Sequence, residues 1–171
     1  MNLAGIKDVL VVRGAQNTGK TTVLKKLYAD FLALCGSSNC HSEPIRKDKN
    51  DIVARVLLPD GRVLGIASAG DNADTVLQGF MSFHDTGQGG FVDGACDIVA
   101  IALRTISKGR QFVKRYQPQA THAEILFDEL RSAHGANWHL PFVPNTANLP
   151  VNARAQHTSS ILSALHNIIG F

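Results

Sequence analysis

The feature that most constrains this chain is an apolar run that leads directly into a glycine-rich loop. Val9–Val12 are all apolar, and after Arg13 comes the loop Gly14–Thr21, GAQNTGKT. An uninterrupted apolar run is typical of a strand buried on both faces, as in a parallel sheet. Beyond the loop, apolar residues recur at helical spacing as far as Leu34, and Gly36 is suited to end that helix. This part of the chain therefore predicts a strand, a loop and a helix in succession.

The next predicted elements are a hairpin and a second buried strand. Runs of β-type residues at 52–58 and 62–67 flank Pro59-Asp60-Gly61, where the glycine can adopt the positive φ of a tight turn. Residues 36–51 are polar and without periodicity, so we expect a surface loop there. The run 96–104, CDIVAIALR, predicts another strand buried on both faces.

Helical patterns occupy much of the remaining sequence. We expect the segment 68–83 to begin with a turn and continue as a helix. Further helices are expected over 121–135 and 153–169, the last with an inward face made of Ile161, Leu162, Leu165 and Ile168. The segment 137–143, NWHLPFV, contains Pro141 and predicts an edge strand. Strands that alternate with helices predict an α/β fold, here a three-layer domain whose sheet is mostly parallel with one antiparallel hairpin.

Size and composition narrow the class of protein. A chain of 171 residues suits one domain, residues 1–171, with a substantial core. The net charge is +3 without a dense Lys/Arg tract, so nucleic-acid binding is not indicated. Three cysteines without framework spacing fit a reducing compartment, and the sequence shows neither a signal-peptide pattern nor a membrane-spanning apolar run. We therefore expect a cytoplasmic protein without a membrane partner.

The loop itself carries the clearest chemical signal. Its sequence fits the pattern G-x-x-x-x-G-K-[ST] at every position, and it lies between a predicted strand and a predicted helix. It resembles the Walker A motif of P-loop NTPases. The resemblance implies that the loop and the helix N-terminus hold the phosphates of a nucleoside triphosphate. The binding residues it implies are Gly14, Ala15, Gln16, Asn17, Thr18, Gly19, Lys20, Thr21 and Thr22.

Two of these residues have specific expected roles. The Lys20 ammonium would reach the terminal phosphates and offset the charge that develops during transfer, which makes it a candidate catalytic residue. The Thr21 hydroxyl would bind Mg²⁺.

A second element, Ser68-Ala69-Gly70-Asp71, follows the predicted hairpin. Together with the hairpin it resembles the corresponding region of small GTPases, where the strand ends in D-T-A-G-Q. In this chain Ala67 takes the place of the aspartate and Asp71 that of the glutamine, and no N-K-x-D motif follows. Asp71 is a candidate for a water-mediated Mg²⁺ contact or for a catalytic base, and equally for a helix N-cap. Ser68 is a weaker candidate, with a buried strand-end hydroxyl as the alternative.

The order of motifs along the chain is similar to that of a group of small bacterial and phage-type ATP-binding proteins. In that group a G-x-x-x-x-G-K-T loop, an S-x-G-D loop and a strand of the form CDI…A-x-R-T follow one another, as 14–21, 68–71 and 96–105 do here. This resemblance implies ATP rather than GTP, with Mg²⁺ as its companion.

The second buried strand ends at Arg104, another candidate catalytic residue. Ligands of doubly wound sheets lie beyond the carboxyl ends of the strands, so Arg104 should face the same crevice as the loop. Its planar guanidinium suits a phosphate or a base. The basic residues that follow, Lys108, Arg110, Lys114 and Arg115, could clamp a phosphate or simply form a solvated helix face.

Three functions are compatible with this pattern. The first is a P-loop NTPase that hydrolyses ATP, with a protein partner supplying missing groups. The second is a small-molecule or nucleotide kinase, favoured by the basic segment 107–115 and the glycine-rich segment 85–95, with a small molecule as phosphate acceptor. The third is a non-catalytic nucleotide-binding switch module, favoured by the missing aspartate at Ala67.

Overall fold

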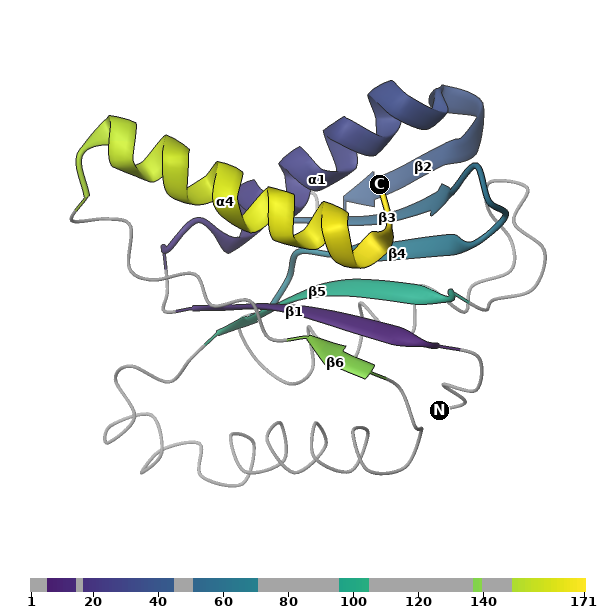
Figure 1. Cartoon of the computed structure of the whole chain (residues 1–171), viewed down its shortest axis with the longest axis horizontal. Helices are drawn as coiled ribbons and strands as arrows, with labels where there is room; N and C mark the ends of the chain where they lie inside the picture. Colours follow the sequence, from purple (N-terminus) through teal and green to yellow (C-terminus); the bar gives the residue numbers. More distant parts are fainter. Residues whose placement is uncertain (1–5, 15–16, 45–50, 71–95, 105–136, 140–148) are drawn as a thin grey trace.

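The computed structural model describes residues 6–14, 17–44, 51–70, 96–104, 137–139 and 149–171 (Figure 1). These residues form an α/β fold. The strands are β1 (Asp8–Gly14), β2 (Cys40–Pro44), β3 (Ile52–Leu57), β4 (Val63–Ala67), β5 (Ile98–Arg104) and β6 (Asn137–His139). The helices are α1 (Lys20–Cys35), the 3-10 turn η1 (Ser37–Asn39) and α4 (Val151–Ile169).

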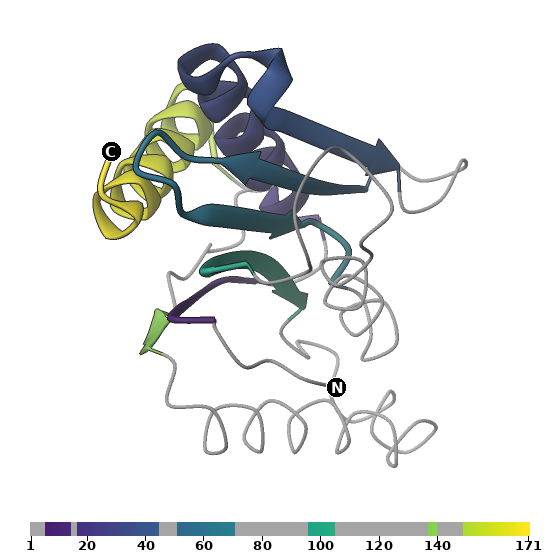
Figure 2. The same ribbon diagram turned by 90° about the vertical axis from the view of Figure 1, so that its right-hand side faces the viewer.

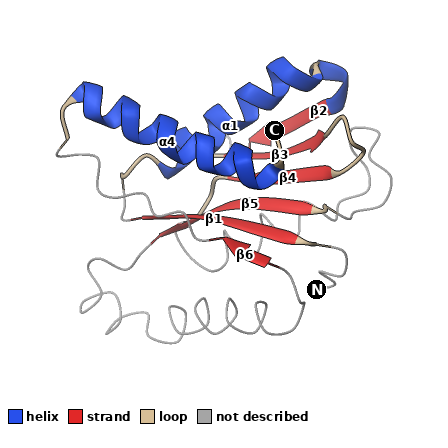
Figure 3. Cartoon of the chain, in the orientation of Figure 1, coloured by secondary structure: helices blue, strands red, loops and turns tan. Residues whose placement is uncertain are grey.

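The described strands form one sheet in the order β2-β3-β4-β5-β1-β6 (Figure 3). The strand β5 pairs in parallel with both β1 and β4, and β6 pairs in parallel with β1. The strand β3 pairs antiparallel with β2 and with β4. Consequently β3 is the one described strand that runs against the others, and its first residue lies at the edge where β1, β4 and β5 end.

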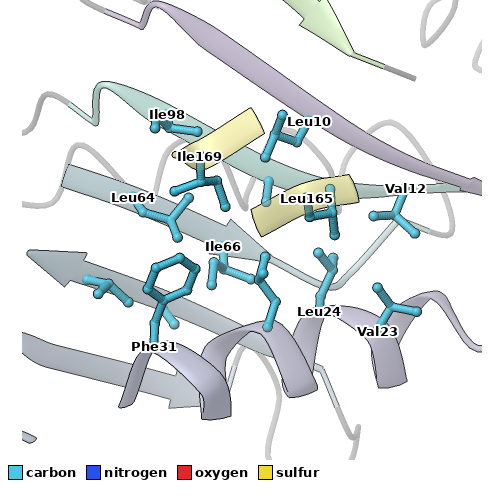
Figure 4. Close-up of a cluster of buried hydrophobic side chains, with 14 of the residues drawn as sticks. Leu10, Val12, Val23, Leu24, Phe31, Leu64, Ile66, Ile98, Leu165 and Ile169 are labelled. Atoms are coloured by element: carbon cyan, nitrogen blue, oxygen red, sulfur yellow. The ribbon is translucent and has the colours of Figure 1, made fainter. Parts of the chain in front are cut away.

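Both described helices cover the same face of the sheet (Figures 1 and 2). Phe31 and its neighbours on α1 pack against Leu165 and Ile169 of α4 and against the inward side chains of the strands (Figure 4). Phe31 is fully buried, and its ring stacks on His166 at a centroid distance of 5.2 Å. Neither α1 nor α4 combines the length with the apolar character that crossing a bilayer would require.

The second face of the sheet is also buried at the central strands β1 and β5. Val11 and Val99, which alternate with the residues that meet the helices, are fully buried, and Ile101 is 1% exposed. Burial on both faces is the reason why β1 and β5 appear in the sequence as unbroken apolar runs.

Several predictions of secondary structure are confirmed. The run Val9–Val12 lies within β1, and 98–104 of the run 96–104 form β5. The hairpin β3–β4 matches its predicted bounds to within a residue, and Gly61 in its turn has φ of 86°. The edge strand predicted over 137–143 is present as β6 at 137–139.

The prediction of a surface loop over 36–51 was wrong for residues 37–44, whereas 45–50 lie outside the described residues. Within that range η1 is followed by β2, which pairs with β3 along its whole length. The segment CHSEP has no apolar run that would predict a strand, and its extended form depends on hydrogen bonds to β3. The last helix was placed correctly, but it starts at Val151 rather than Ala153, and its buried residues include Ile169.

Some predicted elements lie outside the described residues. These are the part of the segment 68–83 that follows Gly70, where a helix is expected, the segments 85–95 and 107–115, and the helix expected over 121–135.

Candidate functional site

A polar cavity lies at the sheet edge where β1, β4 and β5 end. Its volume is about 340 Å³. Its lining consists of Asn17, Thr18, Gly19, Lys20, Thr21, Thr22, Asp51, Ser68 and Gly70. Six of these nine residues are among the predicted phosphate-binding residues, so the cavity lies where the sequence pattern placed a ligand.

The backbone of the loop turns through two left-handed residues. Asn17 has φ of 60° and Gly19 has φ of 93°, while Thr18 between them keeps a negative φ. Asparagine and glycine are the residues that adopt this region at least cost. Left-handed residues in a turn help to form concave groups of backbone N–H donors that bind anions. The need for Gly19, expected from the pattern, is therefore a backbone requirement.

The first helical residue after this turn is Lys20, which is only 8% exposed. Gly19 caps α1 without a side chain, and the first turn of α1 contains no acidic residue. A cation at the positive end of a helix is electrostatically unfavourable, and burial adds a desolvation cost. A bound phosphate would relieve both costs, because it attracts the ammonium and accepts hydrogen bonds from the first N–H groups of α1.

Asp51 is the site residue that the sequence did not reveal. The Thr21 hydroxyl donates a hydrogen bond to Asp51 Oδ1 at 3.2 Å, and the Ser68 hydroxyl donates to the same oxygen at 3.0 Å. Asp51 precedes β3, so the antiparallel direction of β3 brings it to the loop, thirty positions from Thr21 in the sequence. The predicted hairpin could have indicated Asp51, because a hairpin places the residue before its first strand close to the end of its second strand.

The segment after β4 forms a tightly held wall of the cavity. The Ser68 N–H donates to the Ile52 carbonyl at 3.0 Å, and the Ile52 N–H donates to Ser68 Oγ at 2.9 Å. Ser68 is 2% exposed, so the buried hydroxyl considered from the sequence is also a residue of the cavity lining. A Cβ atom added at Gly70 would lie 2.1 Å from the carbonyl oxygen of Ala102. Glycine at position 70 therefore lets the wall lie directly on the backbone of β5.

The structure brings together most of the predicted binding residues. Gly14 ends β1, and the residues from Asn17 to Thr22 line the cavity. Arg104 ends β5 and lies in register beside Gly14. Ala15, Gln16 and Asp71 lie outside the described residues, as do Lys108, Arg110, Lys114 and Arg115.

The composition of the site limits the metal that it could hold. Across the part of the chain that the structure describes, no group of three or more His, Cys, Asp or Glu side chains is arranged to bind a metal ion. A cation at Thr21 and Asp51 would therefore need water or phosphate oxygens to complete its shell, which is the usual coordination of Mg²⁺.

Comparison with known proteins adds no relative. The chain matches no protein-family model, no curated protein and no solved structure.

Proposed function

We propose that the chain is a P-loop NTPase that binds ATP with Mg²⁺ in this cavity and hydrolyses it. The observation that carries the proposal is the buried Lys20 at the N-terminus of α1, directly after the left-handed turn at Asn17 and Gly19. A buried cation at the positive end of a helix is electrostatically unfavourable, and a polyphosphate bound in the turn would offset that cost. We also propose the three-layer form of the fold, supported by burial of both faces of β1 and β5.

Each residue of the proposed site has a separate role. The loop backbone and Lys20 bind the phosphates, and Lys20 offsets the charge that grows on them as the terminal bond breaks. Thr21 contributes a hydroxyl ligand for Mg²⁺, and bound Mg²⁺ would neutralise charge on the phosphate oxygens. Asp71 follows the cavity wall in the sequence and remains the proposed base for the attacking water, with Arg104 as the proposed second cation.

Replacement of Lys20 tests this proposal. A hydrogen bond to a charged partner contributes roughly 1.5–3 kcal/mol, so Lys20→Ala should weaken ATP binding by roughly 10- to 100-fold. Lys26→Ala is the matched control, because Lys26 lies on the same helix, carries the same charge and is exposed. Isothermal titration with ATP and Mg²⁺ gives the affinities, and phosphate release gives the turnover.

Two results separate the alternatives. Equal ATP affinities for Lys20→Ala and Lys26→Ala would exclude the proposed phosphate site. ATP binding without phosphate release, with or without acceptor molecules, would leave a nucleotide-binding module in place of an enzyme.

A further inference from the structure

We propose that Asp51, oriented by Ser68, is the carboxylate that binds the divalent cation of the nucleotide. This inference rests on the proposed function and assigns to Asp51 a metal contact for which the sequence had suggested Asp71. It also places the carboxylate at the start of an antiparallel strand, whereas the sequence pattern directed attention to the ends of parallel strands.

The distance between the two oxygen ligands fits one small cation. Mg²⁺ binds oxygen at 2.0–2.1 Å in octahedral geometry, so neighbouring ligands lie about 2.9 Å apart. Thr21 Oγ1 and Asp51 Oδ1 are 3.2 Å apart. A shift of a few tenths of an ångström would let both oxygens contact one ion, with the Thr21 proton turned away from it.

Ser68 fixes the carboxylate for this role. Its hydroxyl donates to Asp51 Oδ1 while it accepts the Ile52 N–H, so its proton has one direction to take. A carboxylate oxygen has two lone pairs, and the Ser68 hydrogen bond uses one of those on Oδ1. Once the Thr21 proton turns away, Oδ1 can therefore keep its bond to Ser68 and offer the other lone pair to a cation.

Charge gives an independent argument for a cation beside Asp51. Asp51 lines the same cavity as Lys20 and the other described residues of the phosphate loop. A carboxylate in a polyphosphate site repels the ligand unless a cation lies between them. A metal bound to both would change this repulsion into an attraction, which explains why an acidic residue lines the cavity.

The experiment compares nucleotide binding with and without metal. AMP-PNP affinity is measured by isothermal titration in Mg²⁺ and in EDTA, and Mn²⁺ binding to the AMP-PNP complex is followed by electron paramagnetic resonance. The variant Asp51→Asn keeps the shape and the acceptor oxygen but removes the charge. The control Asp60→Asn removes the same charge from the exposed turn at the other end of the hairpin. Circular dichroism and thermal unfolding confirm that each variant folds.

The substitution Asp51→Asn should change the affinity for AMP-PNP in EDTA and the affinity of the complex for Mn²⁺ in opposite directions. In EDTA it should bind AMP-PNP at least as tightly as the wild type, because a repulsive charge is gone. Its complex should bind Mn²⁺ at least about 10-fold more weakly, a loss typical of altered metal sites. Ser68→Ala should also weaken Mn²⁺ binding, but by less than Asp51→Asn, because the Asp51 charge remains.

Other outcomes overturn the inference in distinguishable ways. Equal losses of affinity in EDTA and in Mg²⁺ would mean that Asp51 acts only on the structure of the loop. If Asp51→Asn binds Mn²⁺ as tightly as Asp60→Asn does, Asp51 does not bind the metal, and the proposed function is unaffected. A wild-type protein that binds AMP-PNP under neither condition would refute the proposed function itself. If Asp51→Asn does not fold, unchanged Mn²⁺ binding in Ser68→Ala refutes the positioning role.

Discussion

The contact between Gly70 and β5 supports a sharp prediction for Gly70→Ala. The added Cβ would lie 2.1 Å from the Ala102 carbonyl oxygen, 2.5 Å from its carbonyl carbon and 3.0 Å from its Cβ. Ala102 belongs to a central strand that is hydrogen-bonded to β1, so its backbone cannot rotate away. To restore ordinary contact distances, the wall or the strand must move by roughly 1 Å.

The expected cost follows from this displacement. Overpacking of a core typically costs about 1–3 kcal/mol, and a clash with backbone atoms belongs at the upper end. For a domain of this size, about 3 kcal/mol lowers the melting temperature by roughly 6–12 °C. The comparison variant is Gly61→Ala, which meets nothing within 4 Å but must adopt φ of 86°. A left-handed alanine costs about 1–2 kcal/mol, so this variant should lose less stability than Gly70→Ala.

Urea unfolding monitored by circular dichroism measures both variants. Gly70→Ala should also bind ATP more weakly, because Gly70 lines the cavity, whereas Gly61→Ala should bind ATP normally. A free energy of unfolding for Gly70→Ala within about 0.5 kcal/mol of the wild type would refute the argument. So would a loss smaller than that of Gly61→Ala.

Two further predictions concern groups remote from the cavity. Burial raises the pKa of Asp97, but the Val63 N–H and the Lys7 ammonium outweigh it, so the pKa is lower than the ordinary 3.8. The ionised Asp97 carboxylate therefore stabilises the fold above that pH. In urea unfolding, the wild type should be more stable than Asp97→Asn at neutral pH, and this advantage should vanish as pH falls through the lowered pKa. An advantage that persists in acid would contradict this prediction. Cys96 is only 2% exposed, and this burial raises the pKa of its thiol to about 12. A thiol reagent at pH 8 should therefore modify Cys96 only after denaturation, as peptide mass spectrometry can show, and rapid labelling of the folded protein would disprove it.

The parts of the fold that could be predicted from the sequence are those encoded by adjacent residues. Burial of both faces of β1 produced an apolar run, and the positive φ of Gly61 required a glycine in the hairpin turn. The phosphate loop could be predicted for the same reason, since its strand, turn and helix follow one another without interruption.

The parts that could not be predicted depend on contacts between distant residues. The strand β2 has no apolar run, and its pairing with β3 decides its structure. Asp51 reaches Thr21 only because β3 runs antiparallel, and residue spacing alone does not contain that information. The strand order was equally hidden, because β5 lies between β1 and β4 in the sheet although it follows both in the sequence.

This strand order also has a consequence for how the chain folds. The strands β2, β3 and β4 pair with sequence neighbours, so their part of the sheet can form early and locally. By contrast, β1 pairs with β5, ninety positions further along the chain, and with β6 beyond it. During synthesis the strand that precedes the phosphate loop must therefore wait for residues 98–104 before it gains its first partner in the sheet. Until then its unpaired backbone edges and apolar faces are open to other chains, so the protein is prone to aggregate during this period.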